Sequence, residues 1–144
     1  MAAIASIFNG EGMSSVRTKL NSVITEVNLL DPTDWVDYSS TSTVVGWSSL
    51  PTRVIKYRVI GKQVFYIVNL SGTSNSTSTS FTLAHTSIRQ ADVIGYGINN
   101  GAAVNCLAET PVASSTTTCY SNLAGWTGSG TKSVWVQFFI DIAW

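Results

Sequence analysis

The chain has 144 residues, no net charge at pH 7 and only 11% charged residues, against about 25% in an ordinary soluble domain. Its length fits one domain that buries about two-thirds of the surface exposed by the unfolded chain. Such a domain can fold without a metal or a dense disulfide framework. Because no dense basic cluster is present, nothing attracts the chain to nucleic-acid phosphates, and we expect no nucleic-acid partner.

Membrane and export segments are also not expected. No stretch approaches the roughly eighteen apolar residues that a membrane-spanning helix needs. The first ten residues, MAAIASIFNG, are apolar only briefly and lack the basic region of a secretory signal. The sequence therefore predicts a protein made in the cytoplasm, with neither membrane insertion nor an export signal of its own.

Residues 10–30 carry the only convincing helical pattern. Ser14 or Ser15 can cap the N-terminus of the helix. The helix must end by Asp31, because Pro32 disfavours helical geometry in the residue before it. This gives about fifteen residues, or some 22 Å of helix. Five apolar residues are spaced alternately four and three apart, a heptad seam that faces another helix: Val16, Leu20, Val23, Val27 and Leu30.

The seam is too short to hold an oligomer by itself. Burying five such side chains yields at most about 10 kcal/mol per chain, whereas association costs about 4 to 15 kcal/mol. The rest of the chain would have to share the interface; the alternative is a helix packed on its own domain. We divide the chain into an N-terminal joining arm, residues 1–34, and a β-domain, residues 35–144.

From residue 43 onward the sequence is typical of β-structure. Residues 54–60 and 64–70 predict a hairpin with a tight turn at Gly61-Lys62, and a second turn is predicted at Asn100-Gly101. Residues 133–144 are apolar on both faces, as in a central strand or one that meets a neighbouring subunit. About eight antiparallel strands predict a mainly β domain, a β-sandwich or jelly roll, preceded by one short helix.

Two groups of charged residues were weighed as binding sites. Three aspartates follow the helix at three-residue spacing, but a calcium loop places carboxylates at alternate positions around a central glycine. We therefore assign these aspartates to turns and caps, and we interpret the basic residues that follow as a solvated strand face. The two groups are Asp31, Asp34 and Asp37, and Arg53, Lys56, Arg58 and Lys62.

Patterns that indicate catalysis are almost absent. The single histidine, His85, would have to serve any Ser-His-Asp arrangement, and no zinc-helix motif or phosphate-cradling glycine loop is found. Glycoside hydrolysis needs two carboxylates that face each other across a cleft. Asp92, Glu109 and Asp141 are scattered along the chain, and nothing in the sequence places two of them together. We predict no enzymatic activity, no catalytic residue, no cofactor and no metal.

Cysteine and tryptophan positions raise two further hypotheses. Cys106 and Cys119 bracket a Ser/Thr-rich stretch with no histidine nearby, so a zinc site is not expected. The sequence leaves open a disulfide across neighbouring strands, contributing about 3 kcal/mol, and two buried free thiols, as in a protein folded in the cytosol. Trp126 lies between glycines in a predicted loop. It is the candidate glycan contact, because an exposed aromatic ring can stack on a sugar.

Two segments resemble virion surface proteins of tailed bacteriophages. IFNGEGMSSVRTKLNSVITEVN, at 7–28, resembles the short helical motif of their fibre and spike proteins. YRVIGKQVF, LSGTSNST and FTL, at 57–65, 70–77 and 81–83, are similar to the β-domain that often follows it. The resemblance covers roughly half of the chain. It implies a virion protein, commonly a homotrimer, that decorates the capsid, forms a head or tail fibre, or binds a host surface glycan.

The resemblance and the residues together lead to one expectation and one alternative. We expect a non-enzymatic virion protein made in the host bacterial cytoplasm, a homotrimer with associated helices and an outward β-domain. Its partners would be other capsid or tail proteins and a host surface carbohydrate. The chain has no shaft repeat, which favours a small decoration or head-fibre protein, or the tip of a larger assembly. The alternative is a soluble bacterial carbohydrate-binding module whose helix packs on its own domain.

Overall fold

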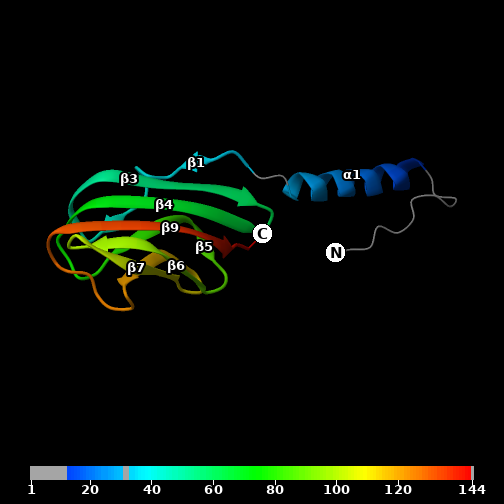
Figure 1. Cartoon of the computed structure of the whole chain (residues 1–144). Coiled ribbons are helices and arrows are strands. Elements are labelled where there is room, and N and C mark those ends of the chain that lie inside the picture. The colour runs from blue at the N-terminus through cyan, green and yellow to red at the C-terminus, as the bar shows by residue number, and fades with distance from the viewer. Residues whose placement is uncertain (1–12, 31–32, 144) are drawn as a thin grey trace.

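A computed structural model shows one helix followed by a nine-stranded antiparallel sheet (Figure 1). It describes residues 13–30 and 33–143, with side chains for 14–25 and 33–143. The elements are α1 (Met13–Leu30), β1 (Val36–Asp37), β2 (Val44–Val45), β3 (Trp47–Ile60), β4 (Gln63–Ser74), β5 (Ser80–Ser87), β6 (Ala91–Asn99), β7 (Ala102–Thr110), β8 (Ser114–Ser121) and β9 (Thr131–Asp141). The predicted mainly β fold with one short helix is confirmed.

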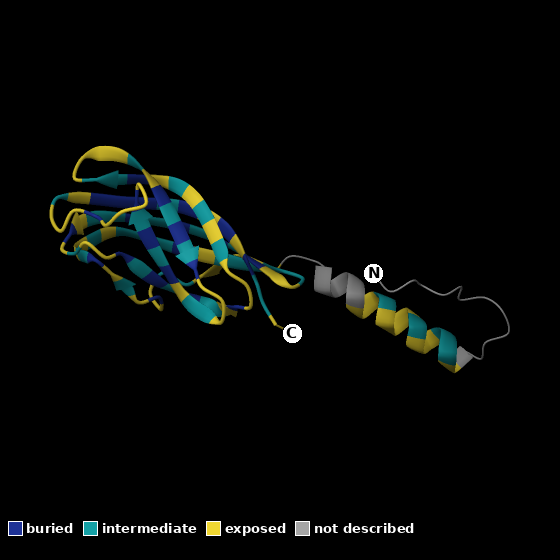
Figure 2. Cartoon of the chain, turned by 90° about the horizontal axis from the view of Figure 1, so that it is seen from below, coloured by how far each residue is buried: buried dark blue, intermediate teal, exposed yellow. Residues whose placement is uncertain are grey.

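The helix predicted from the heptad spacing is present and stands apart from the sheet. α1 has 18 residues and starts one residue before the predicted cap, Ser14. Figures 1 and 2 show it beyond one end of the sheet, with no strand against it. None of its described side chains is buried, and Leu20 and Ile24 are 46% and 55% exposed. The side chains of Val27 and Leu30 lie outside the described residues. The described part of the seam therefore does not pack on the sheet.

The sheet curls until its two edges approach each other. Its strand order is β1-β3-β4-β9-β6-β7-β8-β5-β2. β2 forms one edge and β3 lies next to the other, yet only Gly46 separates these two strands in the chain. Gly46 has a φ of 106°, and a Cβ there would lie 2.4 Å from the Ser78 carbonyl oxygen. The close return of the sheet on itself therefore requires glycine at this position.

Both predicted hairpin turns are confirmed. Ile60 pairs with Gln63 around Gly61, which has a φ of 59°. Asn100 and Gly101 have φ angles of 51° and 83°, and positive φ at both central residues defines the tight turn that suits twisted strands.

The core lies on the inner face of the curled sheet. Strands β4 and β9 alternate buried and more exposed residues with the two-residue period of a half-buried strand. β9 lies between β4 and β6, so the prediction of a central strand is confirmed. Figure 2 shows the alternation as dark and light bands along the strands. The core side chains of these two strands are Val64, Tyr66, Val68, Leu70, Val134, Val136, Phe138 and Ile140.

Candidate functional site

The sheet opens between two of its central strands, β6 and β9. They pair only over residues 96–99 and 132–135. The pairing ends next to Gly95. The two strands are still close at this residue, because a Cβ there would lie 2.3 Å from the Trp135 carbonyl oxygen. Beyond this point β6 remains with β7, and β9 remains with β4 as far as Asp141. At the far end the Ile88 N–H donates to the Asp141 carbonyl at 2.9 Å. The two strands therefore enclose a gap inside the sheet.

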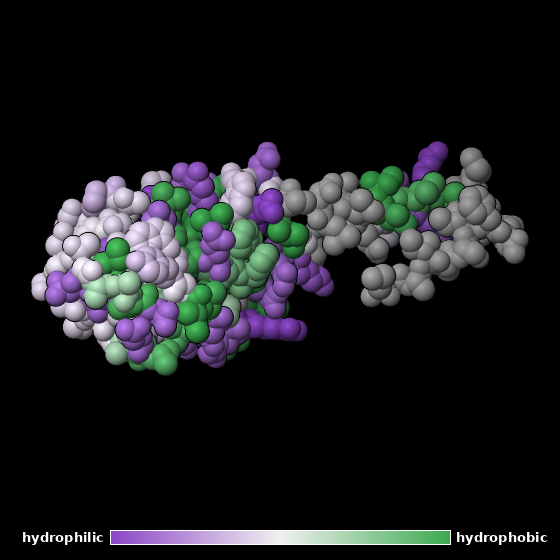
Figure 3. Space-filling model, viewed as in Figure 1, coloured by the Kyte–Doolittle hydropathy of each residue, from purple (hydrophilic) through white to green (hydrophobic). Residues whose placement is uncertain are grey.

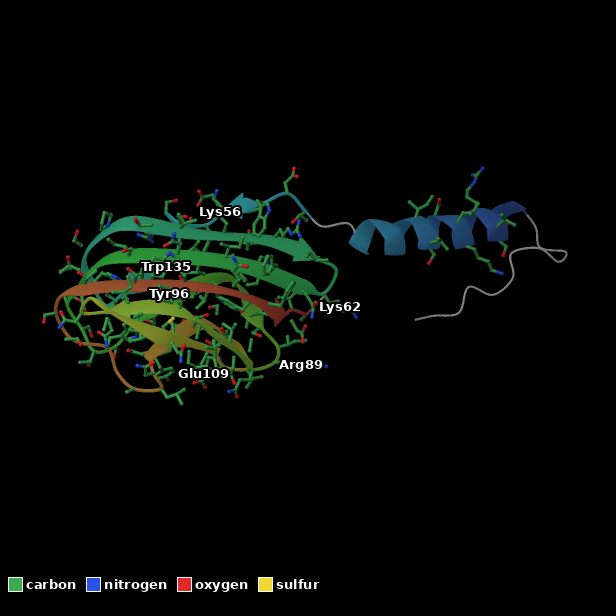
Figure 4. All side chains as sticks on the ribbon, in the orientation of Figure 1. Lys56, Lys62, Arg89, Tyr96, Glu109 and Trp135 are labelled. Atoms are coloured by element: carbon green, nitrogen blue, oxygen red, sulfur yellow. The ribbon has the colours of Figure 1, made fainter. Side chains whose placement is uncertain are left out.

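This gap is a cleft of about 440 Å³, which we call the β6–β9 cleft. Most of its side chains end in a planar polar group, and two phenylalanines also line it: the buried Phe138 and the half-exposed Phe139. Arg89, labelled in Figure 4, marks the end of the cleft nearer α1. The lining residues used below are Gln63, Arg89, Gln90, Asp92, Gln137, Phe139 and Asp141.

Each wall of the cleft pairs an amide with a carboxylate. On the β4–β9 side, Gln63 Nε2 donates to Asp141 Oδ1 at 3.0 Å, and Arg89 Nε lies 3.7 Å from Asp141 Oδ2. On the β6 side, Gln90 Nε2 donates to Asp92 Oδ2 at 3.0 Å. These contacts hold both carboxylates in fixed directions while leaving further lone pairs on each.

The ring of Phe139 is the most exposed apolar side chain of the cleft. It is 48% exposed and stacks on Phe65, with ring centroids 4.6 Å apart and planes inclined by 24°. Phe65 in turn contacts Trp35 at 5.7 Å, and the Arg58 guanidinium lies 5.2 Å from the Trp35 ring centre. These rings, from Trp35 just before β1, Phe65 on β4 and Phe139 on β9, form a row, and Phe139 remains half exposed at its end.

The structure brings together carboxylates that the sequence left scattered. Asp92 pairs with Glu109 across β6 and β7, and Asp141 lines the same cleft as Asp92. Asp92 and Asp141 each accept a hydrogen bond from a glutamine amide. Each carboxylate keeps further lone pairs that can accept hydrogen bonds from a ligand in the cleft.

His85 is half-buried and packs against two tyrosines. Its Nδ1 lies 3.1 Å from the Tyr66 hydroxyl, and its ring meets Tyr57 edge-on at 4.9 Å. Burial lowers the pKa of His85 and raises that of Tyr66. The described partners of His85 are tyrosines, so nothing around it supports the Ser-His-Asp arrangement considered from the sequence.

The prediction that Trp126 contacts a glycan is wrong. The ring is only 2% exposed, and its Nε1 donates to the Cys119 carbonyl at 2.8 Å. The loop folds back because Trp126 N–H also donates to the Thr77 carbonyl. Glycines on both sides of a tryptophan indicate a loop but do not show on which side of the loop the ring lies.

A buried lysine that the sequence did not predict, Lys132, lies beside this ring. Its Nζ donates to the Gly46 carbonyl at 2.7 Å, to Thr79 Oγ1 at 2.8 Å and to the Ser76 carbonyl at 3.1 Å. The ammonium lies 4.8 Å from the centre of the Trp47 ring and 5.7 Å from that of Trp126. Burial lowers the pKa of Lys132 to about 8. Lys132 has the same even-numbered spacing on β9 as the buried residues Val134 and Val136. This shared face of the strand was the sequence signal for its burial.

Cys106 and Cys119 are both buried and free. They lie on β7 and β8, and a hydrogen bond to Cys106, together with burial, raises the pKa of Cys119 well above its ordinary value. Of the two alternatives left open by the sequence, a disulfide or two buried free thiols, the structure has the free thiols.

These thiols should be inert in the folded protein. Thiolate is the reactive form of cysteine, and both exposure and a low pKa are needed to produce it at neutral pH. We expect Ellman's reagent to label neither cysteine in the native state at pH 7.5 and both in denaturant. Rapid labelling of the native protein would contradict the buried pair.

Two of the charged residues considered as candidate binding sites, Asp37 and Arg53, make hydrogen bonds to neighbouring segments. The Asp37 carboxylate accepts the Ser39 N–H at 2.9 Å, which lowers the pKa of Asp37 and confirms the turn. Asp34 is exposed, and Asp31 lies outside the described residues. The predicted solvated face holds for Lys56 and Lys62, which are exposed, but not for Arg53 and Arg58, which are half-buried. Arg53 donates to the Ser42 carbonyl.

The outer face also carries an apolar group, which we call the β6–β7 patch: Ile94, Tyr96, Leu107 and Leu123. Three of these residues are 70%, 51% and 76% exposed, namely Ile94, Tyr96 and Leu123. Tyr96 lies against Trp135 on β9, with ring centroids 5.2 Å apart (Figure 4). Space-filling colours show apolar side chains gathered on the sheet surface and on the described part of α1 (Figure 3). An apolar group this exposed is typical of a contact surface.

Backbone strain holds one member of the patch in place. Leu123 has a φ of 63°, and Asn122 before it has a φ of 48°. A left-handed conformation costs a leucine about 1 kcal/mol or more. Asn122 compensates, because its Oδ1 accepts the Asn105 N–H at 3.0 Å and its own N–H donates to the Asn105 carbonyl at 2.8 Å. The turn thereby presents Leu123 to solvent.

Neither a metal centre nor a membrane-crossing helix is found in the described part of the chain. No group of three His, Cys, Asp or Glu residues is arranged there to hold a metal ion. The helix described is not apolar enough over its length to cross a bilayer. No protein family, curated protein or solved structure matches the chain.

Proposed function

We propose that the protein is a non-enzymatic structural protein of a tailed-bacteriophage virion, a homotrimer joined through α1. It would serve as a capsid decoration, head fibre or tail fibre component, with the curled sheet displayed away from the helices. The observation that carries this proposal is the described part of the apolar seam, Val16, Leu20 and Val23, which is not buried and which no strand covers. The resemblance of residues 7–28 to the helical motif of phage fibre proteins supplies the virion assignment.

The β6–β7 patch is the surface that would complete the interface between copies. Two heptads of helix provide too little apolar burial to outweigh the cost of association. Ile94, Tyr96 and Leu123 expose further apolar area on one face of the sheet. A second copy of the chain covers both surfaces in the assembly we propose.

A charge in the seam should dissociate the protein. For Leu20→Asp we expect the trimer to become a monomer at micromolar concentration in sedimentation velocity, with an unchanged β-type circular dichroism spectrum. Leu20 is 46% exposed, so the substitution alters little within one chain, whereas a carboxylate buried between helices is strongly disfavoured.

The matched control for this variant is Ser22→Asp, which adds the same charge at an exposed position off the seam. This variant should stay trimeric. A monomeric wild-type protein, or a Leu20→Asp variant that remains fully trimeric, would contradict the proposed joining role of α1.

The patch is tested in the same way. Ile94→Glu should weaken association at least tenfold, a change of about 1.4 kcal/mol. Val112→Glu, at a 62% exposed position outside the patch, should leave association unchanged. Mass spectrometry of purified particles from the encoding phage tests the virion assignment itself.

A second candidate function is favoured by the β6–β9 cleft. A carbohydrate-binding module of bacterial origin would need such a cleft and would need no oligomer. A wild-type protein that is monomeric and binds a glycan would support this alternative over the virion protein.

A further inference from the structure

We propose that the β6–β9 cleft binds a neutral glycan, as one or two pyranose rings seated against Phe139. The inference extends the proposed function and rests on it only for the origin of the glycan, which would be the host surface. The binding itself depends on one chain alone.

Both walls of the cleft offer hydrogen-bonding groups of the kind that sugar hydroxyls require. Neighbouring hydroxyls on a pyranose ring each donate and accept, so they fit planar side chains with two polar atoms side by side. Gln137 projects one such amide into the cleft from β9. Asp92 and Asp141 provide carboxylates already oriented by Gln90 and Gln63. Hydrogen bonds to ionised groups are the stronger ones.

The backbone of β9 adds fixed donors and acceptors. Successive residues of a strand direct their N–H and C=O groups to opposite sides. The Asp141 carbonyl faces away from β4, where it accepts the Ile88 N–H. By the same alternation, the backbone groups of Phe139 and Gln137 face the cleft, and the pairing of β9 with β6 ends at Trp135. A ligand in the cleft can therefore bond to backbone that no neighbouring strand occupies.

Phe139 provides the flat apolar surface that the carbon-bound hydrogens of a sugar face prefer. The ring is half exposed and is held from behind by Phe65. Because its position is fixed before binding, little side-chain freedom is lost when a ligand covers it. The volume of about 440 Å³ lies in the range of small-ligand sites.

The charges of the cleft select against acidic ligands. Asp92 and Asp141 line it, and Glu109 lies beside Asp92. The one cation of the lining, Arg89, is already next to Asp141, and its side chain is 78% exposed. The excess of carboxylates repels sialic acids, uronic acids and phosphates. Neutral hexoses and N-acetylhexosamines remain as the ligand class.

The test uses the full chain and a panel of defined sugars. Titration calorimetry or ligand-observed NMR would measure lactose, maltose, cellobiose, N,N′-diacetylchitobiose and 6′-sialyllactose. We expect at least one neutral disaccharide to bind, and lactose to bind more tightly than its sialylated form. Phe139→Ala should weaken the binding by about tenfold or more, and Asp92→Asn by about fivefold.

Val112→Ala is the control, because it removes an exposed apolar side chain that lies outside both the cleft and the β6–β7 patch. It should change the affinity by less than about twofold. Asp92 is exposed, so Asp92→Asn stays folded even if Phe139→Ala does not. Absence of binding to every neutral sugar, or equal affinity in Asp92→Asn and wild type, would overturn the proposal. Sedimentation separates this outcome from failure of the trimer, because the glycan assay does not depend on assembly.

Discussion

Replacing Gly95 by alanine is expected to lower the free energy of unfolding by about 3 kcal/mol or more. A Cβ at this position would lie 2.3 Å from the Trp135 carbonyl oxygen and 2.6 Å from Val136 Cγ1. The first contact is with backbone in the middle of a central strand, so it cannot be relieved by rotating a side chain. The strands β6 and β9 would have to move apart at the point where they meet. Urea denaturation followed by tryptophan fluorescence measures the loss.

Gly128→Ala provides the matched control for this substitution. The nearest atom to a Cβ at Gly128 is Thr77 Cγ2, at 4.0 Å, and its φ is not in the left-handed region. We expect its stability to remain within about 0.5 kcal/mol of wild type. If Gly95→Ala were equally well tolerated, the close crossing of β6 and β9 would be wrong, and with it the shape of the cleft.

Replacing Lys132 by methionine is expected to destabilise the fold by about 3 kcal/mol. Methionine keeps much of the apolar stem but offers no donor to Gly46, Ser76 and Thr79, which would leave buried oxygens without a partner. Lys56→Met, at an exposed position on β3, should have little effect. Denaturation of both variants at pH 7 makes the comparison.

The contribution of Lys132 should also depend on pH in a defined direction. Below about pH 8 the amine is protonated in both states, so the full cost of burying the charge is present. Between about pH 8 and 10.5 the folded chain releases this proton while the unfolded chain retains it. Stability rises with pH wherever the unfolded state binds more protons. Wild type should therefore gain up to about 3 kcal/mol relative to Lys132→Met across this interval. A constant difference would show that the amine titrates normally.

Local sequence patterns predicted those elements whose structure is decided locally. The turn at Asn100-Gly101 needs positive φ at both residues, which these two residue types tolerate, and the structure has it there. Apolar residues on both faces of residues 133–144 predicted a central strand, which β9 is, and the heptad spacing predicted α1.

Features that depend on which strands become neighbours were not visible in the sequence. Asp92 and Asp141 line the same cleft because β9 lies between β4 and β6 and its pairing with β6 stops at Trp135. Trp126 is buried because its loop is bonded to Thr77, about fifty residues earlier in the chain. The cleft and the burial of Trp126 both depend on contacts between segments that are far apart in the chain. The spacing of residues within one short segment does not show which distant segment it will contact.

The central place of β9 also governs when the protein can fold during synthesis. β9 is the last of the described strands to leave the ribosome, yet it joins the two halves of the sheet, β1-β3-β4 and β6-β7-β8-β5-β2. Until it emerges, β4 and β6 each present an unpaired edge, and such edges invite aggregation. The two halves of the sheet therefore cannot join until β9 has emerged.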